Sequence, residues 1–190
     1  MTIRATRTPK QSRSIKTVAA ILEAATEVLA DKGFEGLSTN AVATQAGINI
    51  STLYSYFPNK EALLERLLER YNDKTIEQLK PLLAGNPNKN ERVGIILEAQ
   101  AQLMVDEPWI KSLKEALANT PTLQSLQAHS SRHLIDVVIT QIPQEIAGPK
   151  VSGDDQQVVM TLLVDTFNRG ALIVANTPAA SRKKMLTEVT

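Results

Sequence analysis

Residues 38–60, STNAVATQAGINISTLYSYFPNK, decide the fold, because they predict two short helices joined by a tight turn. Ser38 is a good N-cap for the first helix, and Gly47 suits the left-handed conformation that often ends a helix. Asn49 is placed to cap the second helix, Ser51 to Phe57, and a proline follows that helix and stops it. A helix of about two turns is not stable alone. The stretch therefore predicts a helix-turn-helix held by neighbouring helices.

The second of these helices has an unusual composition for a buried element. Leu53 and Phe57 are spaced i, i+4 and are predicted to point inward. The other positions hold hydroxyl and aromatic side chains, which suit contacts to the phosphates and base edges of DNA. The sequence therefore predicts an exposed polar face formed by Ser51, Thr52, Tyr54, Ser55 and Tyr56.

Apolar residues at helical spacing precede and follow this stretch. The first helix is predicted from about Ser14 to Asp31, with Ile15 on its apolar side and Gly33 ending it. A fourth helix is predicted from about Asn59 to Leu79, with Pro81 ending it. Beyond these, amphipathic segments without strand alternation indicate an all-α chain. The later helices are predicted at Glu91–Asp106, Trp109–Asn119, Leu123–Ile142, Asp154–Asn176 and Ala179–Val189.

The composition narrows the class of protein. The chain has 190 residues, 43% of them hydrophobic, which is ordinary for a globular protein with a sizeable core. It has no cysteine, which excludes disulfides, thiolate zinc sites and a cysteine nucleophile. No apolar run approaches the roughly 18 residues that span a membrane, and the N-terminus lacks the apolar region of a secretory signal. We therefore predict a cytoplasmic protein without a membrane partner.

The charge is unevenly distributed along the chain. The net charge is only +1, yet residues 1–60 carry seven basic residues against four acidic ones. Residues 1–13 hold four of these basic residues and no acidic residue, and they are predicted to be a disordered basic arm. Such an arm either contacts a polyanion or is a solvated tail.

From about Ile15 to Leu68 the chain resembles the DNA-binding domain of TetR-type transcriptional regulators. The order and spacing of several fragments together carry the resemblance. It implies an N-terminal three-helix helix-turn-helix DNA-binding domain at residues 14–58, followed by a C-terminal helical ligand-binding and dimerisation domain at residues 59–190. The fragments are Lys32-Gly33-Phe34, Leu37-Ser38-Thr39, Ala46-Gly47-Ile48, Thr52–Phe57 and Asn59–Leu63.

The resemblance also implies roles in DNA binding for individual residues. Thr39 and Asn40 open the second helix, where family members contact phosphate and, at the position of Asn40, sometimes a base edge. Tyr54 and Lys60 match the usual phosphate-binding tyrosine and lysine. Ile50 departs from the family, which is often polar there; it either touches a thymine methyl group or packs the turn. The full predicted DNA-binding set is Thr39, Asn40, Ile50, Ser51, Thr52, Tyr54, Ser55, Tyr56 and Lys60.

A ligand pocket is predicted less directly, from polar and aromatic residues on the later helices. Trp109 is either a core residue at a helix joint or a pocket wall. His129 and His133 are spaced i, i+4, but two ligands do not make a metal site, so no metal is predicted. The predicted pocket residues are Gln100, Met104, Trp109, His133, Phe167 and Asn168.

By the resemblance, the last two long helices pair across a two-fold axis in a homodimer. Asp154–Asn176 is apolar over more than one face, as such a helix should be, and its predicted interface residues are Val159, Leu163, Phe167 and Leu172. No catalytic residues and no cofactor are predicted. The expected function is a repressor that binds a palindromic operator in double-stranded DNA and is released by a small-molecule effector. The alternatives are a ligand-independent or activating DNA-binding protein, or a helical small-molecule-binding protein or enzyme.

Overall fold

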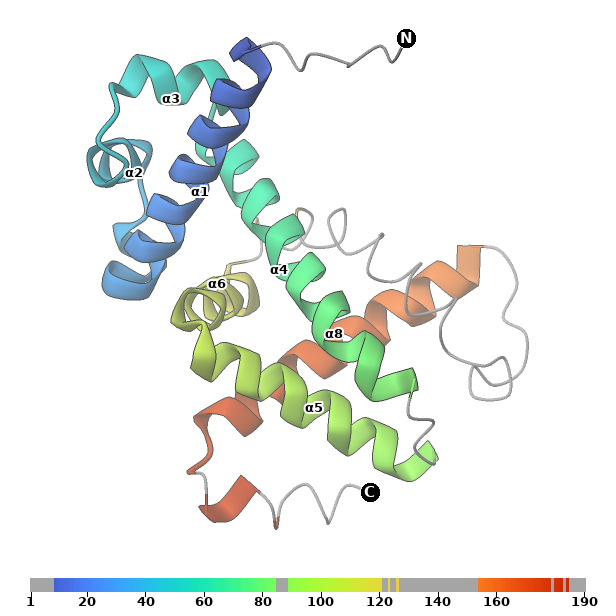
Figure 1. Ribbon diagram of the computed structural model, residues 1–190. Helices are drawn as coiled ribbons and strands as arrows, with labels where there is room; N and C mark the ends of the chain where they lie inside the picture. The colour runs from blue at the N-terminus through green and yellow to red at the C-terminus, as the bar shows by residue number, and fades with distance from the viewer. Residues whose placement is uncertain are drawn as a thin grey trace, which may run out of the picture.

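The computed structural model describes residues 9–84, 89–120, 123, 126, 154–178, 180–182 and 184. Within these residues every regular element is a helix (Figure 1), so the predicted all-α class is confirmed. The predicted helix at Leu123–Ile142 and the segment Ala179–Val189 lie largely outside these ranges. The helices are α1 (Pro9–Gly36), α2 (Thr39–Gln45), α3 (Ile50–Tyr56), α4 (Lys60–Ala84), α5 (Lys89–Asp106), α6 (Pro108–Asn119) and α8 (Asp154–Asn176).

Helix α1 begins earlier than predicted. It starts at Pro9 rather than Ser14, so the prediction of a disordered arm is wrong for residues 9–13. Proline is tolerated in the first turn of a helix because its missing N–H has no intrahelical partner there. Gly33 has φ 65°, which interrupts the helix where it was predicted to end. Ile15 is exposed rather than on the buried side of the helix.

The helix-turn-helix is capped as predicted. Ser38 Oγ accepts a hydrogen bond from Ala41 N at 3.1 Å, and Asn49 Oδ1 accepts one from Ser51 N at 2.8 Å. Gly47 has φ 64°, the left-handed conformation that a side chain would strain. These caps satisfy the first N–H groups of two helices that are too short to be stable without them.

Helix α4 connects the N-terminal helices to the rest of the molecule (Figure 1). Asn59 Oδ1 accepts a hydrogen bond from Ala62 N at 2.8 Å and so caps its start. The prediction that Pro81 ends this helix is wrong, since the helix continues to Ala84. Near the end of a helix a proline removes a single backbone bond, to the carbonyl four residues earlier, and only three residues follow it here.

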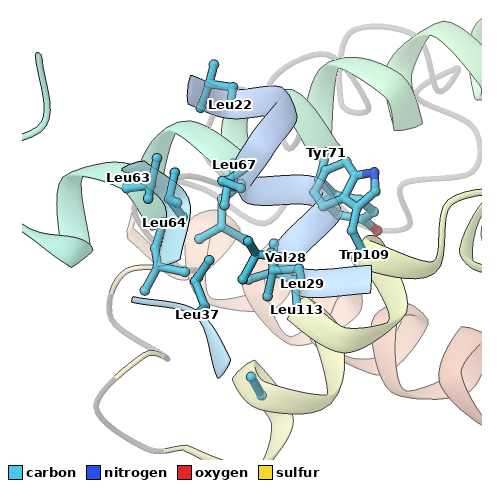
Figure 2. Packing of buried hydrophobic residues seen from close by; sticks show 14 of the residues in the cluster. Leu22, Val28, Leu29, Leu37, Leu63, Leu64, Leu67, Tyr71, Trp109 and Leu113 are labelled. Atoms are coloured by element: carbon cyan, nitrogen blue, oxygen red, sulfur yellow. The ribbon is translucent and has the colours of Figure 1, made fainter. Parts of the chain in front are cut away.

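One continuous cluster of buried side chains runs through the described helices. Figure 2 shows leucines of α1 and α4 packed together, with Leu113 of α6 beside Val28 and Leu29 of α1. Trp109 and Tyr71 lie side by side at one end of this group. Helix α6 packs on α1, and α5 packs on α8. The helices that carry the predicted DNA-binding residues therefore share a core with the helices that follow.

Ion pairs reinforce these helix contacts. Arg70 Nη2 of α4 lies 2.8 Å from Glu23 Oε2 of α1. Lys74 of α4 pairs with Glu107, which also accepts a hydrogen bond from Trp109 Nε1 at 2.7 Å. Although partial burial opposes the shift, hydrogen bonds from Lys74 and Trp109 lower the pKa of Glu107. Among the described helices, none combines the length and apolarity needed to cross a membrane.

Candidate functional site

The outer face of α2 and α3 brings together two of the predicted DNA-binding residues. Thr39, the first residue of α2, and Tyr54 of α3 have their hydroxyl oxygens 3.1 Å apart and hydrogen-bonded. Tyr54 is 48% exposed, whereas Leu53, the residue before it in the sequence, is fully buried. Leu53 and Phe57 thus fix α3 on the core, as predicted, and hold the Tyr54 hydroxyl at the surface. Two adjacent hydroxyl groups from different helices form a site that suits a phosphate oxygen.

The other predicted DNA-binding residues differ in exposure. Asn40, Ser51 and Ser55 are exposed, whereas Thr52 is half-buried. Ser51 donates through its hydroxyl to Asn49 Oδ1 at 2.9 Å, and Ser55 donates to the Thr52 carbonyl at 2.6 Å. The predicted exposed face is therefore only partly correct, because Tyr56 packs against the core. Two residues of this face, Ile50 and Tyr56, are half-buried and pack against the core.

Lys60 is less exposed than predicted. Its ammonium nitrogen lies 4.3 Å from the centroid of the Phe34 ring, at the end of α1. This cation–π contact holds the start of α4 against α1 and fixes the position of a positive charge close to α3. The charge stays at the molecular surface, since the side chain is half-buried rather than buried. A positioned lysine at this place is suited to a phosphate of the DNA backbone.

A group of buried polar side chains occupies the region where α4, α6 and α8 meet. We call this group, formed by Tyr71, Thr75, Lys114 and Asn168, the Tyr71 cluster. Tyr71 Oη donates to Asn168 Oδ1 of α8 at 3.3 Å, and the Lys114 ammonium of α6 lies 4.0 Å from the centroid of the Tyr71 ring. Thr75 follows Tyr71 by one turn of α4. All four residues are buried, and Lys114 is only 3% exposed.

Burial shifts two pKa values in this cluster. Burial lowers the pKa of Lys114 to about 7, and the negative charge of Asp165 on α8 opposes that shift. Burial also raises the pKa of the Tyr71 phenol to about 12, against a smaller opposite effect of the Thr75 hydroxyl. Both shifts arise because a charged group loses water on burial. Near neutral pH the lysine is therefore poised between its charged and neutral forms, while the tyrosine is neutral and able to donate a hydrogen bond.

The predicted pocket residues are mostly buried. Gln100, Met104 and Asn168 are buried on α5 and α8, and Trp109 is a core residue at the joint of α5 and α6. Phe167 is half-buried, and His133 lies outside the described residues, as does His129. Of the predicted pocket residues that the structure describes, Asn168 belongs to the Tyr71 cluster through its hydrogen bond with Tyr71.

Sequence reasoning missed Tyr71, Thr75 and Lys114, although the signal was present. Lys114 interrupts the apolar stripe of α6 at helical spacing from Ile110 and Leu117. Tyr71 continues the leucine stripe of α4, four residues after Leu67. A lysine among core positions is rarely fully buried, so such a position is a site candidate.

A separate, open depression of about 230 Å³ lies between the end of α1 and α6. Gly33, Phe34 and Glu35 line one side, and none of the predicted pocket residues borders it. Its openness to solvent and its distance along α6 from Trp109 separate it from the Tyr71 cluster. The residues of α6 and its C-terminal end that line it are Ser112, Glu115, Ala116, Asn119 and Thr120.

Helix α8 exposes apolar side chains at positions next to the predicted interface residues. Val158, Leu162 and Ile173 are 59%, 61% and 62% exposed. At about 100° per residue they lie within roughly 60° of each other around the helix. Of the predicted interface residues, Phe167 and Leu172 are half-buried, and the side chains of Val159 and Leu163 are outside the described set. Each exposed residue is next in sequence to a predicted interface residue. Because the helix is apolar on more than one face, its sequence does not show which of two adjacent apolar residues is exposed.

Comparison with known proteins confirms the resemblance that the sequence shows. Residues 21–67 match the family described as "Bacterial regulatory proteins, tetR family". The "Fatty acid metabolism regulator protein" of Bacillus subtilis (strain 168) is 28% identical over 87 residues, covering 46% of this chain. The aligned region spans 45% of that relative, and so less than half of its length.

Solved structures establish the fold along almost the whole chain. A structure assigned to the tetR family of transcription regulators, from Shewanella sp. PV-4, has a TM-score of 0.69 at 19% identity, covering 91% of this chain and 95% of that one. The transcriptional regulator FadR from Bacillus subtilis, solved in complex with stearoyl-CoA, has a TM-score of 0.64 at 17% identity, covering 90% and 96%. The chain therefore matches the tetR family of bacterial regulatory proteins at residues 21–67, and it shares its overall fold with these solved structures.

Proposed function

We propose that this protein is a homodimeric transcriptional regulator that binds a palindromic operator in double-stranded DNA. The observation that carries the proposal is the geometry of α2 and α3, where Leu53 anchors the helix and the paired hydroxyls of Thr39 and Tyr54 face outward. The match to the tetR family at residues 21–67 supports it, because the relatives that match this region are regulators. We place DNA binding in residues 14–58 and regulation and dimerisation in residues 59–190.

The exposed apolar stripe of α8 supports the homodimer. Val158, Leu162 and Ile173 expose most of their surface in one row, and such rows mark interaction sites. A monomer has a single recognition helix of about two turns. Such a helix makes too few contacts for specific DNA binding with a dissociation constant in the usual range of about 10⁻⁸–10⁻¹¹ M. A second copy packed against this stripe would double the contacts and match the symmetry of a palindromic operator. The two α3 helices would then be about 34–36 Å apart.

A small-molecule effector is the second part of the proposal. A regulator of the same fold has been solved in complex with stearoyl-CoA. In this chain, buried polar residues lie where α4, α6 and α8 meet, and α6 also packs on α1. An effector that binds one arrangement of these helices more tightly shifts the population toward it. We propose that this protein is a cytoplasmic repressor and that the effector releases it from its operator.

The dimer is tested by a charge placed in the α8 stripe. Leu162→Glu is expected to give monomers, because the glutamate would lose water at a buried interface, and to lower operator affinity at least about a hundredfold. Sedimentation velocity and fluorescence anisotropy measure the two effects. Lys80→Glu, an exposed substitution on α4, serves as a control that changes charge without changing assembly. A wild-type protein that is monomeric at micromolar concentration and still binds a palindromic operator tightly would refute this arrangement.

Lys60→Ala tests the predicted phosphate contact. The substitution is expected to weaken binding to all DNA sequences alike and to reduce the slope of log K against log salt by about one unit. Phe34→Leu is the matched control, because it removes the ring under the ammonium and keeps the charge. That variant should lose a little stability and keep most of the salt slope. An unchanged affinity and slope in Lys60→Ala would remove Lys60 from the DNA-binding residues.

A further inference from the structure

The Lys114 ammonium is buried in the core, and no ion pair to it is found within the described residues. Its side chain is 3% exposed and rests on the face of the Tyr71 ring at 4.0 Å. Of the described carboxylates, Asp165 of α8 acts on it through its negative charge. A buried ammonium costs free energy unless it is paired or hydrogen-bonded.

The same cluster contains hydrogen-bonding atoms that are buried and unsatisfied. The Asn168 carboxamide accepts from Tyr71 Oη through Oδ1, yet its Nδ2 has no hydrogen-bond partner within the described part of the chain. The Thr75 hydroxyl oxygen is likewise buried without a hydrogen-bond partner there, although the hydroxyl acts on the neighbouring Tyr71 phenol and lowers its pKa. Each such atom carries a desolvation cost that a bound partner would remove.

We infer that the Tyr71 cluster is a binding site for the anionic group of a small organic molecule, a carboxylate or a phosphate monoester. Lys114 supplies the positive charge, and Asn168 Nδ2 and the Thr75 hydroxyl supply hydrogen bonds. These three groups come from α6, α8 and α4, and the contacts of Tyr71 with Lys114 and Asn168 hold them around one ring. Donors and a cation that converge in a buried place are the features that recognise an anion.

The surroundings indicate what else the molecule carries. Met104 and Trp109 belong to the same core cluster as Tyr71, so the body of the ligand meets apolar side chains. Gln78 Oε1 and Gln100 Oε1 are also buried and unsatisfied in the described helices. These two oxygens accept hydrogen bonds, so they cannot bind the anion, which is itself an acceptor. They could accept from a hydroxyl or N–H group of the ligand, or from the Lys114 ammonium. The ligand class is therefore an amphipathic organic anion.

The regulatory role of this site rests on the proposed function, because the bound anion would be the effector. Binding at Lys114 acts directly on α6, which packs on α1. The binding step itself requires no DNA, so it is measured on the full chain alone. Loss of operator binding and loss of anion binding are then separate results.

The test compares anions with neutral molecules of the same shape. Titration calorimetry at about pH 6 and constant ionic strength uses butyrate, octanoate, benzoate and octyl phosphate, each against its alcohol. At that pH Lys114 is charged and the carboxylates are ionised. We expect at least one anion to bind with a Kd about ten- to a hundredfold below that of its alcohol, the range for a charge-assisted hydrogen bond. The carboxylate and phosphate arms distinguish the two anion types.

Variants locate the effect at the cluster. Lys114→Met should remove the preference for the anion and leave binding of the alcohol in place. Lys111→Met, on the exposed side of the same helix, should keep the preference. Asn168→Asp, which keeps the acceptor for Tyr71 and adds a fixed carboxylate, should also remove it. These three variants separate a specific counter-ion from a general effect of positive charge.

Proton uptake gives an independent readout. Tyr71 of α4 and Asp165 of α8 are the described titratable groups that act on Lys114. At about pH 8 the lysine is mostly neutral, so anion binding should take up close to one proton, seen as a dependence of the measured heat on the buffer. The inference is overturned if no anion in the series binds better than its alcohol, or if Lys114→Met keeps the preference and the proton uptake.

Discussion

Leu53→Ala is expected to lower the free energy of unfolding by about 2–5 kcal/mol and to abolish operator binding. Leu53 is 0% exposed and is the buried residue of α3, a helix of seven residues. A helix of that length has no stability of its own, so it depends on core contacts for its place, and Leu53 is its most deeply buried side chain. Loss of the leucine side chain therefore displaces the DNA-contacting face of α3 as well as removing a core contact.

Chemical denaturation measures the stability change, and fluorescence anisotropy with labelled operator measures binding. Ser55→Ala is the control on the same helix, because its hydroxyl is exposed and bonds only to the Thr52 carbonyl among the described residues. That variant is a control for stability alone, because Ser55 belongs to the predicted DNA-binding residues, and its free energy of unfolding should stay within about 0.5 kcal/mol of the wild-type value. If Leu53→Ala unfolds at the wild-type denaturant concentration, the assignment of Leu53 as the anchor of α3 is wrong.

Lys114→Met is expected to raise the free energy of unfolding by roughly 3 kcal/mol at about pH 6, because it removes a buried charge. The folded lysine has a pKa of about 7, below its unfolded value of 10.5. Below pH 7 both states are protonated, and the wild type bears the full cost of the buried ammonium. Between about pH 7 and 10 the unfolded state binds more protons, so the stability of the wild type rises with pH.

The difference between variant and wild type should therefore shrink as pH rises from 7 toward 10. Thermal or urea unfolding at several pH values measures it. Measurements stop near pH 10, because above it the raised pKa of Tyr71 makes a contribution of opposite sign. Lys111→Met, in which the lost ammonium is exposed, should show no such pH-dependent difference. Parallel stability curves for Lys114→Met and the wild type would show that Lys114 is not held in a desolvated site.

Local sequence rules predicted the parts of the fold that depend on neighbouring residues. Ser38, Asn49 and Gly47 act through backbone groups within a few positions, and each has the predicted role. The limits of α1 and α4 were missed at Pro9 and Pro81, because the effect of proline depends on its place in the helix. Asp154–Asn176 has the predicted bounds, but its exposed face depends on packing with α5.

The candidate sites show the same division. Thr39 and Tyr54 were named from a motif, and the structure adds their contact across fifteen positions of sequence. Asn168 was predicted as a pocket residue, but its grouping with Tyr71 and Lys114 was not, because the three come from helices far apart in the chain. Only their packing brings them together. A lysine in an apolar stripe was the one local sign of it.

The continuous core determines how movement spreads through this molecule. Leu113 and Ile110 of α6 are buried in the same cluster as Val28 and Leu29 of α1, without a layer of polar residues or a loop between them. Close-packed side chains do not deform gradually; they exchange between discrete arrangements. We therefore expect a displacement of α6 to turn α1 as one unit with α2, which packs on α1, and α3, which packs on α2, rather than to loosen these N-terminal helices.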